Sequence, residues 1–127
     1  MAFINFHPSD NCKVKLYTGN ATSRTISTGV TAYNSDGYVI GTADSLNSNG
    51  QSFVTFNWKA GNSAGSANTN GSINSTVTVN TAAGFSIVKY VGTGSNATIG
   101  HGLSSAPAFV VCKNITSAAS WISYHRL

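Results

Sequence analysis

The sequence predicts an all-β protein, an antiparallel β-sandwich of short strands joined by many loops, and three observations support this fold class. Uncharged polar residues dominate, with 18 Ser, 14 Thr, 14 Asn and 13 Gly among 127 residues, and such residues favour turns and strands. Charged residues make up only 8%, so the Lys and Glu that keep exposed helices well populated are scarce. Apolar and polar residues also alternate with period two, as they do in strands with one buried face.

Two stretches show this alternation most clearly, and both predict strands. FVTFNWK spans 53–59, and we expect it to form a central strand with its tryptophan in the core. INSTVTVN spans 73–80 and is the clearest strand in the chain. The residues that share one face are Val54, Phe56 and Trp58 in the first stretch, and Ile73, Val77 and Val79 in the second.

Shorter apolar runs between turn signals predict the other strands. These are FINF at 3–6, KVKLY at 13–17, YVIG at 38–41, FSIVKYV at 85–91, AFVVCK at 108–113 and SWISYH at 120–125. The clearest turn signals are NSDG at 34–37, NSNG at 47–50 and TAAG at 81–84. A helix fits only around Ala43–Asn47.

The chain contains an internal similarity between YTGNATSRTI at 17–26 and YVGTGSNATI at 90–99. We interpret each copy as a strand, a glycine turn and a second strand, with the tyrosine and isoleucine packed inward. The half-repeats would span about 1–60 and 73–127, joined by a flexible Gly/Ser/Asn-rich connector at 61–72, and would complete one sandwich domain over 1–127. Chance similarity in a chain rich in Ser, Thr and Gly is the alternative.

Residues for catalysis or metal binding are sparse. The chain has no Glu, and its carboxylates are Asp10, Asp36 and Asp44; the NSDG sequence makes the second of these a turn residue rather than half of a catalytic pair. The three histidines are isolated and lack metal-ligand spacing, and His101 lies between glycines that predict a turn. We therefore predict no enzymatic activity, no catalytic residues, no metal and no cofactor.

Charge, hydropathy and cysteine content indicate which partners and which environment to expect. The seven bases are spread singly, which argues against nucleic acid as a partner. The sequence shows no signal-peptide pattern and no apolar stretch long enough to insert into a membrane. Cys12 and Cys112 could form one bridge, but assembly in a reducing cytoplasm favours two buried, free, structural cysteines.

Several blocks resemble a repeated domain of structural proteins from marine tailed bacteriophages. The most specific are WKAG and GFSIVKYVGTG…IGHGL…AP, and the resemblance covers nearly the whole chain. It implies a lectin-like, concanavalin-like or jelly-roll β-sandwich within a virion or tail fibre protein. The first half is shorter here than in that family, because TISTG runs almost directly into VTAYNSDGYVIG. Part of the loops that would hold a sugar is thus missing, so the resemblance supports residence in the virion better than sugar binding.

The function expected on these grounds is that of a non-enzymatic bacteriophage virion structural protein. It would lie on the particle exterior, in a tail fibre, tail appendage or capsid decoration, after assembly in the host cytoplasm. Its partners would be other virion proteins and further copies of itself, as a trimer or a repeating assembly. The apolar FINF edge strand, with Phe3, Ile4 and Phe6, is the predicted oligomer interface.

Two other functions stay open from the sequence. The first is a carbohydrate-binding module for host recognition, with Tyr33, Tyr38, Trp121 and Tyr124 as the aromatics that would contact a surface glycan. The second is a glycan-degrading enzyme, which the lack of a clear carboxylate pair disfavours.

Overall fold

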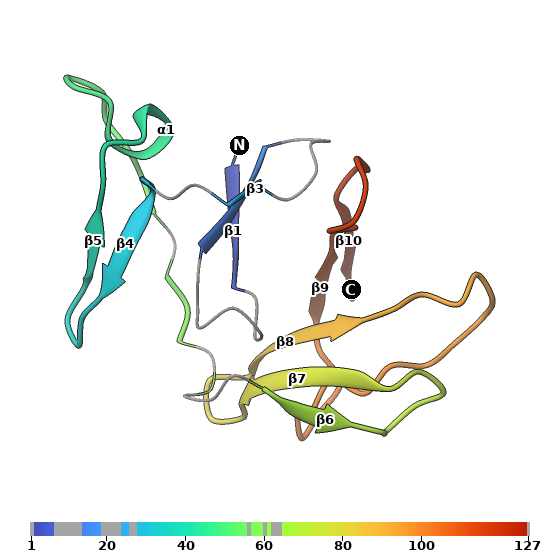
Figure 1. The fold of residues 1–127 in the computed structure, drawn as a ribbon. Helices are drawn as coiled ribbons and strands as arrows, with labels where there is room; N and C mark the ends of the chain where they lie inside the picture. The colour runs from blue at the N-terminus through green and yellow to red at the C-terminus, as the bar shows by residue number, and fades with distance from the viewer. Residues whose placement is uncertain are drawn as a thin grey trace. The chain divides into compact units, whose positions relative to one another are not determined.

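The computed structural model describes residues 2–6, 14–18, 24–25, 28–55, 57–59, 61 and 65–126. Within them the protein is all-β, built from small sheets with antiparallel pairing and one helical turn (Figure 1). The chain divides into two compact units, one built mainly on Lys13–Asn57 and the other mainly on Trp58–Val111, with the ends of the chain contributing to both.

A three-stranded sheet is formed by β1 (Ala2–Phe6), β2 (Val14–Thr18) and β3 (Arg24–Thr25), in that order. The strands predicted at FINF and KVKLY are confirmed, and β1 lies at the edge of its sheet as expected. Strands β2 and β3 are antiparallel, with Leu16 opposite Arg24.

The hairpin of β4 (Val30–Tyr33) and β5 (Tyr38–Ile40) forms a two-stranded antiparallel sheet. Its turn is the predicted NSDG, closed by a hydrogen bond of 2.8 Å from the Asn34 amide to the Gly37 carbonyl. The register shifts by one residue between Val30 and Ala32, which is a β-bulge in β4. The hairpin leads into α1 (Asp44–Asn47), the one helix that the sequence predicted.

The central structure of the second unit is a three-stranded antiparallel sheet, ordered β6 (Ser66–Asn68), β7 (Ser75–Asn80) and β8 (Phe85–Tyr90). The predicted strand at INSTVTVN is confirmed as the central strand of this sheet, and TAAG forms the turn between β7 and β8. Among the described residues the most buried apolar side chains lie here, Val77 at 4% exposed and Ile73 at 8%.

One face of this sheet is covered by the loop that follows β8. Val77 and Val79 alternate with Thr78 and therefore share this face. A Cβ atom on Gly102 would lie 3.0 Å from Val77 Cγ1, so the loop backbone packs directly on the strand. The Ser75 hydroxyl also donates a hydrogen bond of 3.4 Å to the Gly100 carbonyl, and Ser75 is buried. The loop thus takes the place of a second layer.

The opposite face of the sheet carries Thr78, Asn80 and Phe85. The Trp58 ring stacks on the Phe85 ring with centroids 6.1 Å apart and planes inclined by 10°. The Asn80 side-chain amide donates a hydrogen bond of 3.0 Å to the Lys59 carbonyl. The segment before the sheet therefore covers this second face.

A final two-stranded sheet joins β9 (Phe109–Cys112) and β10 (Ile122–His125). Both strands were predicted, from AFVVCK and SWISYH. The Arg126 amide donates a hydrogen bond of 2.8 Å to the Ala108 carbonyl and continues the pairing beyond β10.

The strand predicted at FVTFNWK is wrong for the residues that the structure describes. Residues 53–55 and 57–59 form no strand, and Phe56 lies outside the described residues. Val54 is 78% exposed and Trp58 55% exposed, so Trp58 is not the core residue that its alternation indicated. An alternating pattern makes a segment amphipathic, but a strand also needs a partner for its backbone groups.

Two further predictions, a flexible connector at 61–72 and a buried Cys112, are wrong. The segment at 61–72 was expected to be a flexible connector, yet Ser66–Asn68 forms β6 and pairs with β7, because backbone hydrogen bonds need no large side chains. Cys112 was expected to be buried, but its thiol is free and exposed, since both faces of β9 are open. Cys12 lies outside the described residues.

The two copies of the internal similarity have different structures. In the first copy, β2 and β3 form the expected pair of strands. In the second, Tyr90 ends β8 and is 42% exposed, and no second strand follows. Ile99 instead makes a single parallel bridge with Ile73. Tyr90 therefore does not pack inward, and the sequence similarity does not extend to a common backbone arrangement.

Candidate functional site

The candidate acidic and metal-ligating side chains do not come together in the described part of the chain. No group of three or more His, Cys, Asp or Glu side chains could hold a metal ion there. Asp36 lies in the turn of the β4–β5 hairpin, and Asp44 begins α1 beyond the open end of the same hairpin. The two carboxylates therefore lie at opposite ends of β5, not across one cleft.

His101 forms a hydrogen bond within its own loop. Its Nδ1 accepts a hydrogen bond of 3.0 Å from the Leu103 amide, across Gly102, whose φ is +72°. The side chain is half-buried. Residues 100–103 form irregular backbone rather than an assigned turn, although the positive φ of Gly102 is a conformation that favours glycine.

No helix among the described residues is long and apolar enough to cross a membrane.

Four side chains of the β4–β5 hairpin share one face, and we call them the β4–β5 surface. Tyr33 lies directly opposite Tyr38, and Val30 directly opposite Ile40. The bulge in β4 brings both pairs to the same face, because it shifts the alternation of β4 by one residue. Tyr33 is 46% exposed and Ile40 40%, whereas Tyr38 and Val30 are half-buried. The structure thus brings together two of the four predicted aromatics.

The β9–β10 hairpin exposes apolar side chains on both of its faces. The rings of Phe109 and His125 lie 6.3 Å apart, which places them on one face. The alternation of β10 then places Ile122 and Tyr124 on the other face. The exposed fractions are 59% for Phe109, 65% for Ile122 and 63% for Tyr124. Trp121, just before β10, is half-buried.

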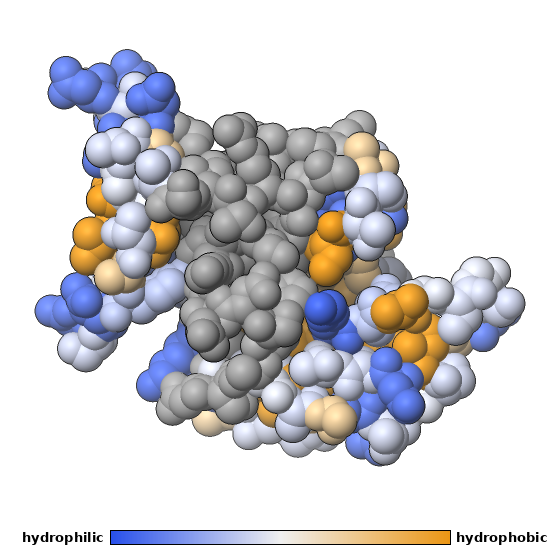
Figure 2. Space-filling model, in the orientation of Figure 1, coloured by the Kyte–Doolittle hydropathy of each residue, from blue (hydrophilic) through white to orange (hydrophobic). Residues whose placement is uncertain are grey.

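These exposed residues include some that sequence reasoning missed. Phe109 and Val111 lie in the apolar run AFVV, which is typical of a buried strand, and Ile122 lies in another predicted strand, so nothing local marked them as exposed. Phe3, Ile4 and Phe6, the predicted oligomer interface, lie in the edge strand β1, and their side chains lie outside the described part of the structure. Figure 2 shows apolar residues at the surface over β4 and β5.

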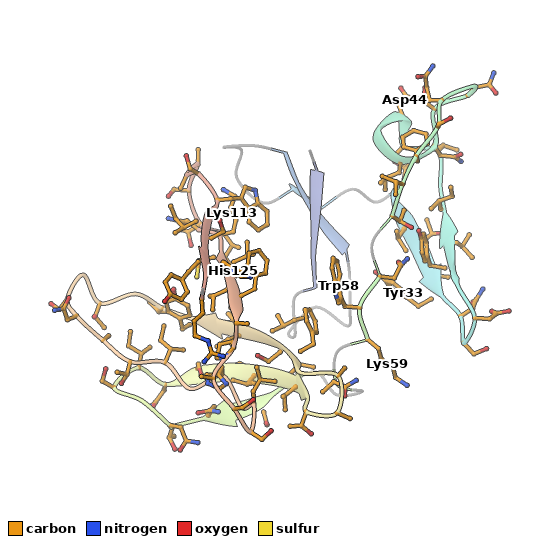
Figure 3. All side chains as sticks on the ribbon, turned by 180° about the vertical axis from the view of Figure 1, so that it is seen from behind. Tyr33, Asp44, Trp58, Lys59, Lys113 and His125 are labelled. Carbon is orange, nitrogen blue, oxygen red and sulfur yellow. The ribbon has the colours of Figure 1, made fainter. Side chains whose placement is uncertain are left out.

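Charge is distributed unevenly over the two hairpins. The chain carries no base between Arg24 and Lys59, and this segment contains Asp36 and Asp44. No Asp or Glu follows Asp44 in the chain. Lys113 directly follows β9 and Arg126 directly follows β10, so the second hairpin is basic. Figure 3 labels Asp44 beside α1, and Lys113 and His125 on the β9–β10 hairpin.

Comparison with known proteins gives the family. No curated protein and no solved structure matches the chain. One family model matches residues 11–127, which is nearly the whole chain, and it is described as a domain of unknown function, DUF7483. The chain therefore belongs to the DUF7483 family.

Proposed function

We propose that this protein is a non-enzymatic structural component of a bacteriophage virion. It would lie on the exterior of the particle, in a tail fibre, a tail appendage or a capsid decoration, after assembly in the host cytoplasm. The blocks WKAG and GFSIVKYVGTG, which resemble virion proteins of tailed phages, support this assignment. A lectin-like or jelly-roll sandwich would be formed by the sheets other than β6–β8, because other segments cover both faces of that sheet.

The exposed apolar strands are the observation that carries the proposal. An isolated two-stranded hairpin is marginally stable in water. The β4–β5 and β9–β10 sheets each have two strands within the described residues. Val111 is 40% exposed and Val39 45% exposed on these hairpins. Apolar surface of this kind is typical of proteins that are covered by partners in an assembly.

The composition supports the same role. Only 8% of the residues are charged, so solubility depends on Ser, Thr and Asn, whose hydration changes little with salt. At high ionic strength, salt screens interactions between exposed charges that are more than a few ångströms apart. A particle surface of this composition would thus behave alike in dilute buffer and in seawater.

Labelling of virus particles tests the proposal. An antibody raised against the purified chain should decorate phage particles purified from an infected culture, at one structural location seen by immunogold electron microscopy. Peptides of the chain should also appear in the proteins of the gradient-purified particles. If the chain is abundant in infected cells yet absent from intact particles, the proposal is wrong.

The Tyr33–Tyr38 pair favours a second candidate, a carbohydrate-binding function. Cross-strand aromatic side chains lie about 4.5–5.5 Å apart at Cβ, which makes one continuous apolar platform. Such a platform can stack against a sugar ring, and the exposed Asp36 in the adjoining turn can accept hydrogen bonds from sugar hydroxyls.

Titration calorimetry with maltohexaose and chitohexaose tests this second candidate. If either sugar binds through the platform, the double variant Tyr33→Ala/Tyr38→Ala should weaken binding at least about tenfold, because stacking on both rings is lost. Phe109→Ala, at an aromatic that is 59% exposed on the other hairpin, is the control and should bind as the unmodified protein does. Equal weakening by both variants would refute the assignment to the tyrosines.

A further inference from the structure

The β4–β5 and β9–β10 hairpins both expose large apolar side chains on a two-stranded sheet. Each is a two-stranded sheet within the described residues, so no third strand there completes it. Both carry large apolar side chains that are 40% or more exposed, including Tyr33 and Ile40 on the first hairpin and Phe109, Ile122 and Tyr124 on the second. Burying such side chains is the main source of association energy between proteins.

The two hairpins also carry opposite charges in matching places. On the first, Asp36 lies at the turn and Asp44 beyond the open end. On the second, Arg126 follows the open end and is exposed, and Lys113 begins the connection to β10. The Lys113 ammonium donates a hydrogen bond of 2.6 Å to the Ala119 carbonyl, which holds this cation at the start of the connection.

We infer that copies of this chain associate head to tail, the β4–β5 hairpin of one copy packing on the β9–β10 hairpin of the next. Apolar side chains of the two hairpins would be buried against each other. Asp36 of one copy would pair with Arg126 of the next, at the rim of this contact. Exposed opposite charges at an interface rim select the partner and its orientation more than they add affinity.

Charge complementarity favours a second copy in this arrangement over the symmetric alternatives. Two β4–β5 hairpins facing each other would bring the carboxylates of Asp36 and Asp44 near the carboxylates of Asp36 and Asp44 in the second copy. Two β9–β10 hairpins would likewise bring Lys113 and Arg126 together. Like charges across an interface are repulsive, whereas the head-to-tail contact brings acid against base. A head-to-tail contact closes into a ring or continues as a filament, depending on the rotation between copies.

This inference rests on the proposed function, since it names the partner through which a virion component would assemble. The two can fail separately. If the antibody labels phage particles but the purified protein stays monomeric, the proposed function stands and the inference is rejected. Association of the purified protein without labelling of particles would do the reverse.

Charge reversal followed by mixing is the test, with sedimentation velocity of the full chain at micromolar concentration as the measurement. The unmodified protein should sediment as an oligomer. Asp36→Lys and Arg126→Glu should each weaken association about tenfold, because each places like charges across the contact. Lys59→Glu, an exposed base outside both hairpins, changes the net charge as Arg126→Glu does and should leave association unchanged.

The decisive sample is an equimolar mixture of Asp36→Lys and Arg126→Glu. Two favourable contacts are then possible between the variants. In one, the unmodified Asp36 of the second variant meets the unmodified Arg126 of the first; in the other, both charges of the pair are reversed. The mixture should regain the association of the unmodified protein, although each variant alone is weakened. A mixture no stronger than its components, or a monomeric unmodified protein, overturns the inference.

A second pair of variants tests the apolar part of the contact. Ile122→Ser should weaken association at least about fivefold, because it removes an apolar side chain that is 65% exposed on β10. Val91→Ser is the matched control, at a side chain that is 80% exposed in the loop after β8, and should have no effect. Circular dichroism should show the same fold for all variants. Equal weakening by both serine variants would show nonspecific association and reject the interface.

Discussion

Gly102 is the point at which the loop after β8 packs on the central strand, and its replacement by alanine tests that packing. Its φ is +72°, in the left-handed region that L-residues enter at a cost of roughly 1–2 kcal/mol. A Cβ there would also lie 3.0 Å from Val77 Cγ1, closer than van der Waals contact allows. Val77 is 4% exposed in the middle of the sheet and cannot move aside without repacking.

Gly94 provides a control with the same backbone conformation and no neighbour. Its φ is +75°, and a Cβ there would meet no atom within 4 Å. Gly94→Ala should therefore lower the free energy of unfolding only by the cost of the left-handed conformation. The lower entropy of the unfolded chain offsets about 0.4–1 kcal/mol of that cost. Gly102→Ala should cost a further 1–3 kcal/mol or so through overpacking.

Urea or thermal unfolding measures the difference between the two variants. At this size, roughly 3–6 °C of melting temperature corresponds to each kcal/mol. Gly102→Ala should thus melt clearly below Gly94→Ala. Adding Val77→Ala should cost less in the Gly102→Ala background than in the unmodified protein, because the two changes share one contact. Equal melting temperatures for the two glycine variants would refute the packing of this loop on β7.

Three further predictions follow from the described contacts. Trp58→Ala should cost about 1–2 kcal/mol in urea unfolding, because the ring, which stacks on Phe85, is 55% exposed and so only partly buried; a loss above about 3 kcal/mol would show that Trp58 is a core residue. The Cys112 thiol should react with a thiol reagent in the native protein as fast as after unfolding, since it is exposed; slow native labelling would contradict this. Asn80→Ala should cost about 1–2 kcal/mol by unfolding, through the lost bonds to Lys59 and to the turn after β7; no loss would show that these bonds do not hold the segment.

Local patterns were sufficient to predict most of the strands and turns. INSTVTVN has both the alternation of a half-buried strand and a following TAAG turn, and it became β7 and its hairpin. NSDG determined the β4–β5 turn in the same way, because Asn, Asp and Gly adopt turn conformations at low cost. The single helical turn at Asp44–Asn47 also lies where the sequence placed it.

The candidate surfaces were predicted only in part. Tyr33 and Tyr38 were named from the sequence, but their common face depends on the register of the hairpin. The apolar run in β9 is typical of a strand buried on both faces, and the structure leaves both faces exposed. The uneven charge, with no Asp or Glu after Asp44, is visible in the sequence and could have indicated these surfaces.

Local sequence patterns therefore predict an all-β chain, most of its strands and its turns. The pairing of the strands, and the segments that cover them, depend on contacts between distant parts of the chain. FVTFNWK has the pattern of a strand yet forms none in its described residues, whereas the small residues at Ser66–Asn68 form β6. The reason is that alternation depends on a residue's immediate neighbours, while sheet formation and burial depend on backbone and side-chain partners far along the chain.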